Sequence, residues 1–295
     1  YEMDQQTAII RINRPEQLNA LDENVVQGLR AAWIRYREDD QARCAILCAA
    51  GERAFSVGAD IKQAPKEMWQ AVPSVGVQLD KPIIAAVQGF CVGGAYILVQ
   101  MCDLVVAASD TRFRYPEAQV GFTGGLIASC AARVPHKIAM EFMLLGQDID
   151  AQRAFDVGMV NRVVPAGQQL AAALEYARIL ERSAPLVVQT IKNFVDQTLP
   201  KGPAERAALA RDHLLKVRDS EDGAEGRAAF KAKRPPAIDD VIRDARAAGL
   251  TGLDLLGIGL TLRQIRLIGA HIDTLLIDNN FIRSRACGND QGPND

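Results

Sequence analysis

The sequence lacks a strong excess of charge of either sign. Its 295 residues contain 34 Lys and Arg against 36 Asp and Glu, which gives a net charge of -2 and a pI near 6.0. A protein surface that binds a polyanion normally carries a basic excess. We therefore expect no nucleic-acid partner.

The sequence also lacks a long uninterrupted apolar run. Although 48% of its residues are hydrophobic, no run reaches the roughly 18 residues that a membrane-spanning helix requires. No signal-peptide pattern opens the printed sequence, which starts at Tyr1. We expect a cytoplasmic protein with no membrane partner, and this length and apolar content can bury one large core or two small ones.

Cysteine and histidine are scarce and scattered. The six cysteines form no paired CxxC framework, and the four-residue spacing of Cys44 and Cys48 on an expected strand is typical of neither zinc nor redox sites. We interpret them as free thiols of a reducing compartment. The histidines, His136, His213 and His271, are not clustered. With no metal-ligand set and no phosphate-binding glycine signature, we expect neither a metal nor a separate cofactor.

Apolar strand-like runs alternate with amphipathic helical segments along the chain. The expected strands are Thr7–Ile12, Ala45–Cys48, Ile83–Val87, Leu104–Ala107 and Val160–Val164. The expected helices are Glu23–Asp39, Leu126–Arg133, Lys137–Leu145, Ala151–Val157, Gly167–Ala184, Pro185–Gln197 and Pro203–Asp219. This alternation predicts an α/β fold of repeated ββα or βαβ units.

The most informative stretch is an apolar strand that leads into a Gly-Gly turn. The strand Ile83–Val87 precedes Gly93 and Gly94, where a helix is expected to begin. Glycine permits a sharp turn and brings a backbone N–H, at the positive end of a helix dipole, close to a ligand. A second Gly-containing turn lies in Ala54–Lys62, after another apolar strand. Two such turns can donate two N–H groups to one carbonyl oxygen, as in an oxyanion hole, and Glu117 supplies an acid–base carboxylate.

A series of segments, in order and with similar spacing, resembles the crotonase, or enoyl-CoA hydratase/isomerase, superfamily. The segments are Arg14–Leu21, Ala54–Lys62, Lys81–Ala95, Met101–Ala108, Phe113–Phe122, Ala139–Pro165 and Ser220–Pro236. The resemblance implies a crotonase-like spiral of ββα units with a helical C-terminal part that forms trimers. We expect a catalytic core over residues 1–190, a helical trimerisation region over 191–236 and an atypical extension over 237–295.

The resemblance also implies roles for individual residues. The two oxyanion N–H groups correspond to Ala59 and Gly94, and the catalytic acid–base group corresponds to Glu117. The residues expected against the coenzyme A part of an acyl-CoA thioester are Ala59, Asp60, Ile61, Lys62 and Gly94. The candidates for the acyl pocket are Tyr96, Ile97, Tyr115 and Trp69. Coenzyme A would bind as part of the substrate, and the expected assembly is a homotrimer or a dimer of trimers.

One departure from the family pattern decides between chemistries. Hydratases of this family carry a second glutamate three residues after the second glycine of the pair, where this chain has Ile97. Because a branched alkyl group cannot hold or deprotonate water, we predict a single-glutamate enzyme that shifts an enoyl-CoA double bond. A hydratase or related lyase that recruits another polar group is the alternative. A catalytically silent binding protein is a third reading, which the intact Ala59, Gly94 and Glu117 oppose.

Two further segments depart from the family. Thr123–Arg133 differs from the usual glycine-rich sequence next to the catalytic glutamate, which predicts a different pocket shape beside Glu117. Gln63–Asp80 is short and trims the loop that usually walls the acyl pocket. Within it, Met68 and Trp69 either cap a different acyl group or fill the gap.

Overall fold

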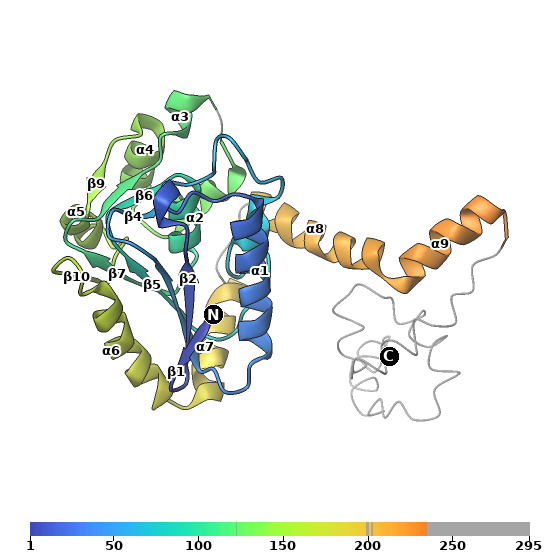
Figure 1. The fold of residues 1–295 in the computed structure, drawn as a ribbon, viewed down its shortest axis with the longest axis horizontal. Helices are drawn as coiled ribbons and strands as arrows, with labels where there is room; N and C mark the ends of the chain where they lie inside the picture. Colours follow the sequence, from blue (N-terminus) through green and yellow to red (C-terminus); the bar gives the residue numbers. More distant parts are fainter. Residues whose placement is uncertain (122, 199–200, 202, 235–295) are drawn as a thin grey trace, which may run out of the picture. The chain divides into compact units, whose positions relative to one another are not determined.

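The computed structural model describes residues 1–121, 123–198, 201 and 203–234 (Figure 1). The chain divides into two compact units, residues 1–213 and 214–295. All the strands named below and the candidate site lie in the first unit. The predicted extension, 237–295, lies outside the described residues.

Two β-sheets organise the first unit. The larger sheet has the order β1-β2-β3-β5-β7-β10, and its strands are Glu2–Asp4, Thr7–Ile12, Cys44–Ala49, Ile83–Val87, Leu104–Ala108 and Arg162–Val164. The smaller sheet has the order β4-β6-β8-β9, and its strands are Ala54–Ser56, Phe90–Val92, Arg112–Arg114 and Ile149–Asp150. Neighbouring strands are parallel, except that β1 is antiparallel to β2 and β9 is antiparallel to β8.

From β3 to β8, consecutive strands alternate between the two sheets, and this gives that part of the chain a spiral course. Strand β5 of the larger sheet leads to β6 of the smaller one and then to helix α2 (Gly94–Gln100). Strand β7 leads likewise to β8 and then to α3 (Glu117–Val120). Each of these two turns adds one strand to each sheet and one helix, which confirms the predicted α/β fold of ββα units. The strands of the smaller sheet were not predicted, because two or three residues are too few to show a period.

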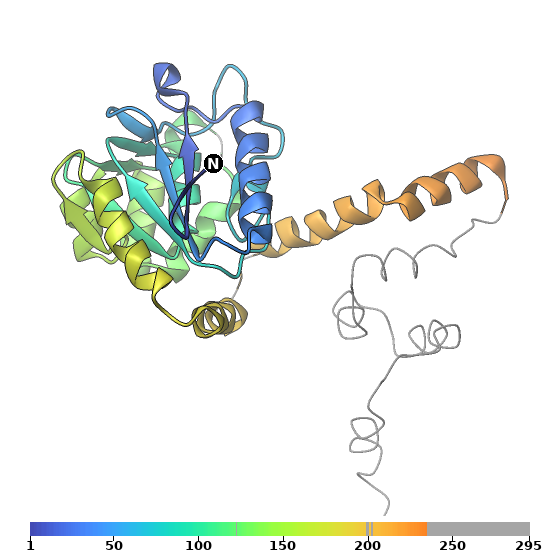
Figure 2. The ribbon, with the colours of Figure 1, turned by 60° about the horizontal axis from the view of Figure 1, so that its bottom comes forward.

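Helices cover both faces of the larger sheet (Figures 1 and 2). On one face, α1 (Glu23–Glu38) begins where the Asp22 carboxylate accepts the Val25 N–H at 2.8 Å, a typical N-cap. On the other face, α6 (Gln169–Glu181) packs alanines against Ile46 and Ile84. Because both faces are covered, β3 and β5 are entirely buried, which explains their continuous apolar sequences.

The remaining helices lie close to their predicted bounds, except α9, for which no separate helix was predicted. They are α4 (His136–Leu145), α5 (Ala151–Asp156), α7 (Pro185–Thr198), α8 (Pro203–Asp219) and α9 (Glu221–Ala232). The helix predicted over Leu126–Arg133 is a 3-10 helix, Gly125–Ala132. Two shorter 3-10 helices are η1 (Pro15–Gln17) and η2 (Met68–Ala71). Across the described part of the chain, no helix combines the length and apolar character needed to cross a membrane.

Candidate functional site

The Gly-Gly turn joins strand β6 to helix α2 in a conformation that only glycine adopts readily. Gly93 has φ +58° and ψ -120°, and its N–H donates to the Arg114 carbonyl at 2.8 Å. A Cβ on Gly93 would lie 2.6 Å from Oε1 of Glu117. The catalytic candidate Glu117 therefore lies directly against this turn, as the family resemblance implies.

The second turn contacts the first. Gly58 has φ +85°, and a Cβ there would lie 2.7 Å from the Val92 carbonyl oxygen and 3.2 Å from the Gly94 nitrogen. The backbone of Leu21 fixes this turn, because its N–H donates to Gly58 O at 2.8 Å and its carbonyl accepts the Asp60 N–H at 3.0 Å. This parallel bridge leaves the N–H of the intervening residue, Ala59, turned away from Leu21.

The structure thus brings together the two predicted oxyanion donors. A Cβ on Gly94 would lie 3.9 Å from the Ala59 nitrogen. Among the described residues, neither the Ala59 N–H nor the Gly94 N–H donates to a protein acceptor. Two unused backbone donors in adjacent turns can stabilise an oxygen that gains negative charge, and one such donor is typically worth about 3 kcal/mol in the transition state.

Glu117 opens helix α3, and its carboxylate is half-buried. Its Oε2 atom is buried and has no hydrogen-bond partner among the described residues. Burial raises the pKa of Glu117 to about 7, against an ordinary value of 4.5. A carboxyl group with this pKa can both take up and release a proton near neutral pH, as a general acid–base residue must.

Asp60, Ile61 and Lys62 follow the Ala59 turn but differ in availability. The Asp60 carboxylate accepts from Arg14 Nη1 at 2.6 Å and from the Lys62 N–H at 2.9 Å. The Arg14 hydrogen bond, above all, lowers the pKa of Asp60. Its side chain therefore holds the turn, whereas Lys62 is exposed and Ile61 is 94% exposed. Both side chains are therefore accessible from solvent.

The predicted acyl-pocket side chains are mainly packed in the protein core. Tyr96 lies with its ring against Phe113 and Phe142, at centroid distances of 6.0 and 4.8 Å, and its hydroxyl is 3.4 Å from Cys130 Sγ. These contacts give Tyr96 a structural role. Ile97, on the same helix, is only 6% exposed, and its side chain offers no polar atom.

The other two pocket candidates have polar contacts of their own. The Tyr115 hydroxyl lies 3.0 Å from Thr123 Oγ1, and Tyr115 is buried. Trp69, partly buried, donates from Nε1 to Glu67 Oε2 at 2.5 Å. Contact of these residues with an acyl group stays a prediction.

Sequence reasoning missed the residues that support the oxyanion turn. Arg14 pairs with Asp60, lies 3.6 Å from Asp22 Oδ2, and donates to the Ala20 carbonyl at 3.2 Å. Asn19 donates to the Ala54 carbonyl at 2.9 Å. The only signal in the sequence was that Arg14 and Asn19 lie in the family-like segment Arg14–Leu21.

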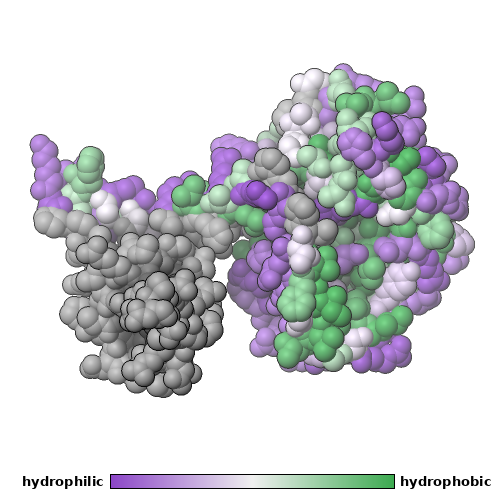
Figure 3. All heavy atoms as spheres, turned by 180° about the vertical axis from the view of Figure 1, so that it is seen from behind, coloured by the Kyte–Doolittle hydropathy of each residue, from purple (hydrophilic) through white to green (hydrophobic). Residues whose placement is uncertain are grey.

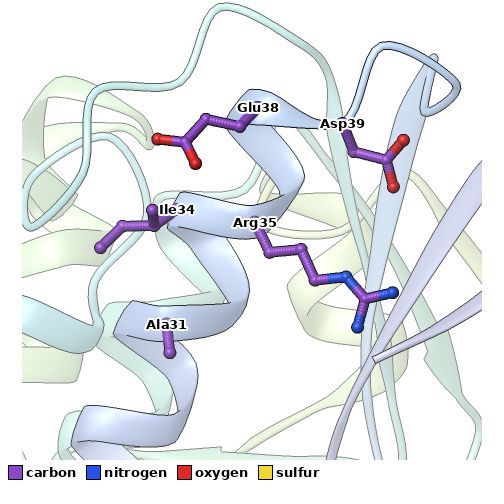
Figure 4. A pocket seen from close by; sticks show the side chains of 5 residues that line it. All are labelled: Ala31, Ile34, Arg35, Glu38 and Asp39. Atoms are coloured by element: carbon purple, nitrogen blue, oxygen red, sulfur yellow. The ribbon is translucent and has the colours of Figure 1, made fainter.

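An open groove of about 450 Å³ lies along α1 and does not belong to the candidate site (Figure 4). Its lining residues are Ala31, Ile34, Arg35, Glu38 and Asp39. Two of them contact the side chain of Tyr1. Asp39 accepts a hydrogen bond from the Tyr1 hydroxyl at 2.9 Å, and the Arg35 guanidinium lies 3.9 Å from the centroid of the Tyr1 ring. No group of three or more His, Cys, Asp or Glu side chains suited to a metal ion occurs within the described ranges.

Comparison with known proteins agrees with this geometry. The sequence model of a family described as Enoyl-CoA hydratase/isomerase matches residues 2–241. The (E)-benzylidenesuccinyl-CoA hydratase of Thauera aromatica is 33% identical over 252 residues, which cover 80% of this chain and 97% of that protein. The carnitinyl-CoA dehydratase of Proteus mirabilis is 34% identical over 242 residues, which cover 77% of this chain and 92% of the relative.

A solved structure extends the similarity to three dimensions. The crystal structure of carnitinyl-CoA hydratase from Mycobacterium avium superposes with a TM-score of 0.63 at 31% identity, covering 81% of this chain and 97% of that one. The family match spans most of the chain, and the Glu117 carboxylate lies against the paired turns where the family resemblance places it. This chain therefore belongs to the enoyl-CoA hydratase/isomerase family of the crotonase superfamily.

Proposed function

We propose that this protein adds water reversibly to the double bond of a 2-enoyl-CoA thioester, with Glu117 as its acid–base carboxylate. The observation that carries the proposal is the position of Glu117 against Gly93, next to the unused N–H groups of Ala59 and Gly94. Similar proteins are named hydratase or dehydratase. These names favour the hydratase alternative over the isomerisation that the sequence alone favoured.

The geometry suits a mechanism with one carboxylate. The thioester oxygen accepts from the N–H groups of Ala59 and Gly94, which polarise the conjugated double bond. Ionised Glu117 takes a proton from water as the water oxygen bonds to the β-carbon, and negative charge moves to the thioester oxygen. Protonated Glu117 then returns that proton to the α-carbon, and dehydration is the same sequence reversed.

Double-bond isomerisation is the second candidate, and Ile97 is the observation that favours it. Glu117 would remove a proton at the α-carbon or γ-carbon of the thioester and return it to the other carbon. The oxyanion donors would stabilise the same enolate. This reaction needs no water in the site, and the Ile97 side chain offers no group to hold one.

A panel of thioesters separates the two reactions. The protein is incubated with crotonyl-CoA and with 3-enoyl-CoA thioesters, and the conjugated double bond is followed by ultraviolet absorbance. Hydration predicts loss of conjugation from the 2-enoyl substrate, with a 3-hydroxyacyl product identified by mass. Gain of conjugation from a 3-enoyl substrate, without any hydroxyacyl product, would instead establish the isomerase. No turnover of any thioester would favour a binding protein.

Replacing Ile97 tests whether the missing carboxylate limits hydration. We expect Ile97→Glu to raise the rate of crotonyl-CoA hydration about tenfold or more, because a second carboxylate can orient the attacking water. Ile97→Gln, matched in size, should raise it less. An unchanged rate in a folded Ile97→Glu variant would show that the water is already positioned by another group.

We further propose that the active assembly is a homotrimer or a dimer of trimers and that the thioester's coenzyme A part contacts Ile61 and Lys62. The support for assembly is the outward apolar face of helix α7. The support for the coenzyme A contact is the exposure of both residues directly after the Ala59 turn. Location in the cytoplasm stays a prediction.

A further inference from the structure

One side chain outside the catalytic set lies over the oxyanion turn. If Gly94 carried a Cβ, that atom would lie 1.9 Å from Met68 Cε and 2.7 Å from Met68 Sδ. The thioether end of Met68 therefore fills the space directly against the Gly94 backbone. The same point is 3.9 Å from the Ala59 nitrogen, so the space that Met68 fills against Gly94 is also close to the Ala59 turn.

Met68 lies between an exposed segment of the chain and a buried one. The residues before it, 61–64, are exposed, whereas Ala71 and Val72 after it are fully buried. Trp33 fixes the buried side, because its Nε1 donates to the Ala71 carbonyl at 2.7 Å. Glu67 accepts from both Trp69 and Arg211. The residues on either side of Met68 thus make defined contacts, while Met68 itself is only partly buried.

The chemistry of methionine suits a residue that has to move. Met is unbranched, has three rotatable side-chain bonds and carries a polarizable thioether, so it fills irregular gaps at little cost. Its side chain can turn aside without any change in the backbone. A thioester oxygen that accepts from both Ala59 and Gly94 needs the space next to the Met68 methyl group.

We propose that Met68 determines which acyl groups the site admits, by turning aside for the thioester and then forming the wall beside the acyl α-carbon. Gly93 and Gly94 are adjacent, with Glu117 against the first and Met68 against the second. A substrate whose α-carbon faces Glu117 therefore has its α-substituent next to Met68. A branch at the α-carbon would collide with the thioether, whereas a linear acyl group would pass it. This inference rests on the acyl-CoA function proposed above.

Binding of saturated thioesters tests the inference without requiring turnover. Calorimetry measures the Kd of butanoyl-CoA and of 2-methylbutanoyl-CoA for the full chain and for Met68→Ala, Met68→Phe and the size-matched control Met68→Leu. One methylene group in a pocket is typically worth about 10- to 200-fold. We expect Met68→Ala to improve the branched-to-linear binding ratio about tenfold, Met68→Phe to weaken both ligands about tenfold, and Met68→Leu to stay within about threefold.

The outcomes separate this inference from the proposed function. If the wild type binds neither thioester, the acyl-CoA function fails and the role of Met68 fails with it. If the wild type binds them but the ratio is unchanged in folded Met68→Ala, and Met68→Phe binds like Met68→Leu, Met68 merely packs. If circular dichroism shows that Met68→Ala does not fold, the Kd values of Met68→Phe and Met68→Leu decide whether Met68 controls binding.

Discussion

At the scale of single residues, the Glu117 carboxylate combines partial burial with an oxygen that has no protein partner among the described residues. Burial disfavours the ionised form more than the backbone hydrogen bond favours it, which is why its pKa rises to about 7. Because the ionised carboxylate is disfavoured in the folded protein, Glu117 lowers the free energy of unfolding above neutral pH. Such a cost is common at catalytic positions, where function and stability conflict.

The pH dependence of turnover follows from this pKa. Glu117 has to be ionised when it takes the proton from water, so kcat/KM for hydration should rise as pH increases through about 7. Rates measured between pH 5 and 9 test this, with an unrelated acyl-CoA enzyme as a control for substrate stability. A rate already at its plateau at pH 5.5 would contradict a raised pKa.

Stability should change in the opposite direction. Because the folded-state pKa of Glu117, about 7, exceeds its ordinary value of 4.5, the folded state binds the proton more tightly. Its stabilising effect is complete below pH 4.5 and is lost as pH rises to about 7. Glu117→Gln should therefore increase the free energy of unfolding by about 1 kcal/mol at pH 8, after discounting for solvent screening.

Urea titrations at two pH values measure that difference. The same variant at pH 4 is the control, since both side chains are then neutral and the two proteins should have similar stability. A Glu117→Gln protein that is less stable than the wild type at pH 8 would show that the carboxylate has a stabilising partner.

At the scale of elements, helix α7 is attached to the core through a buried lysine. Lys192 is 9% exposed, and its Nζ donates to Asp103 Oδ2 at 2.8 Å and to the Lys81 carbonyl at 3.0 Å. Asp103 also accepts the Ile83 N–H at 2.7 Å, so its carboxylate joins α7 to strand β5. The face of α7 toward the core is therefore polar where it makes these bonds.

Removing this lysine should loosen the helix. We expect Lys192→Met to lower the free energy of unfolding by about 1 to 3 kcal/mol, because Asp103 and the Lys81 carbonyl lose a charged donor. Lys137→Met, an exposed lysine on α4, is the matched control and should change stability by less than about 0.5 kcal/mol. Equal effects of the two substitutions would show that the buried bonds contribute nothing.

The sequence predicts elements better than it predicts their contacts. Thr7–Ile12 and Pro203–Asp219 match the observed bounds, because a strand of six residues or a long helix shows its period clearly. Glu117 and the Gly-Gly turn were predicted from family-like segments. The pairing of Arg14 with Asp60 was not, since a contact across 46 residues leaves no local pattern. The position of Met68 over Gly94 was missed for the same reason.

At the scale of the whole molecule, apolar side chains lie exposed along α7. They are Leu186, Val187, Ile191, Phe194 and Val195, and a hydrophobic patch is visible on this face of the molecule (Figure 3). An exposed apolar helix face of this kind is typical of a protein–protein interface. It supports the proposed assembly through α7.

Light scattering tests the assembly. We expect a mass of three or six times the 32.0 kDa chain at micromolar concentration. Phe194→Glu should reduce that mass by placing a charge on the apolar face, whereas Phe155→Glu, on α5, should not. A monomeric wild type with full activity would refute both the assembly and its importance for the site.

The central claim is that Glu117 transfers the proton while the backbone N–H groups of Ala59 and Gly94 hold the thioester oxygen. The most direct test is Glu117→Gln, assayed for crotonyl-CoA hydration and, by calorimetry, for butanoyl-CoA binding. We predict a fall in kcat of about 10²- to 10⁴-fold with the Kd for butanoyl-CoA changed by less than about threefold. A Glu117→Gln enzyme that retains turnover within about tenfold of the wild type would contradict the account.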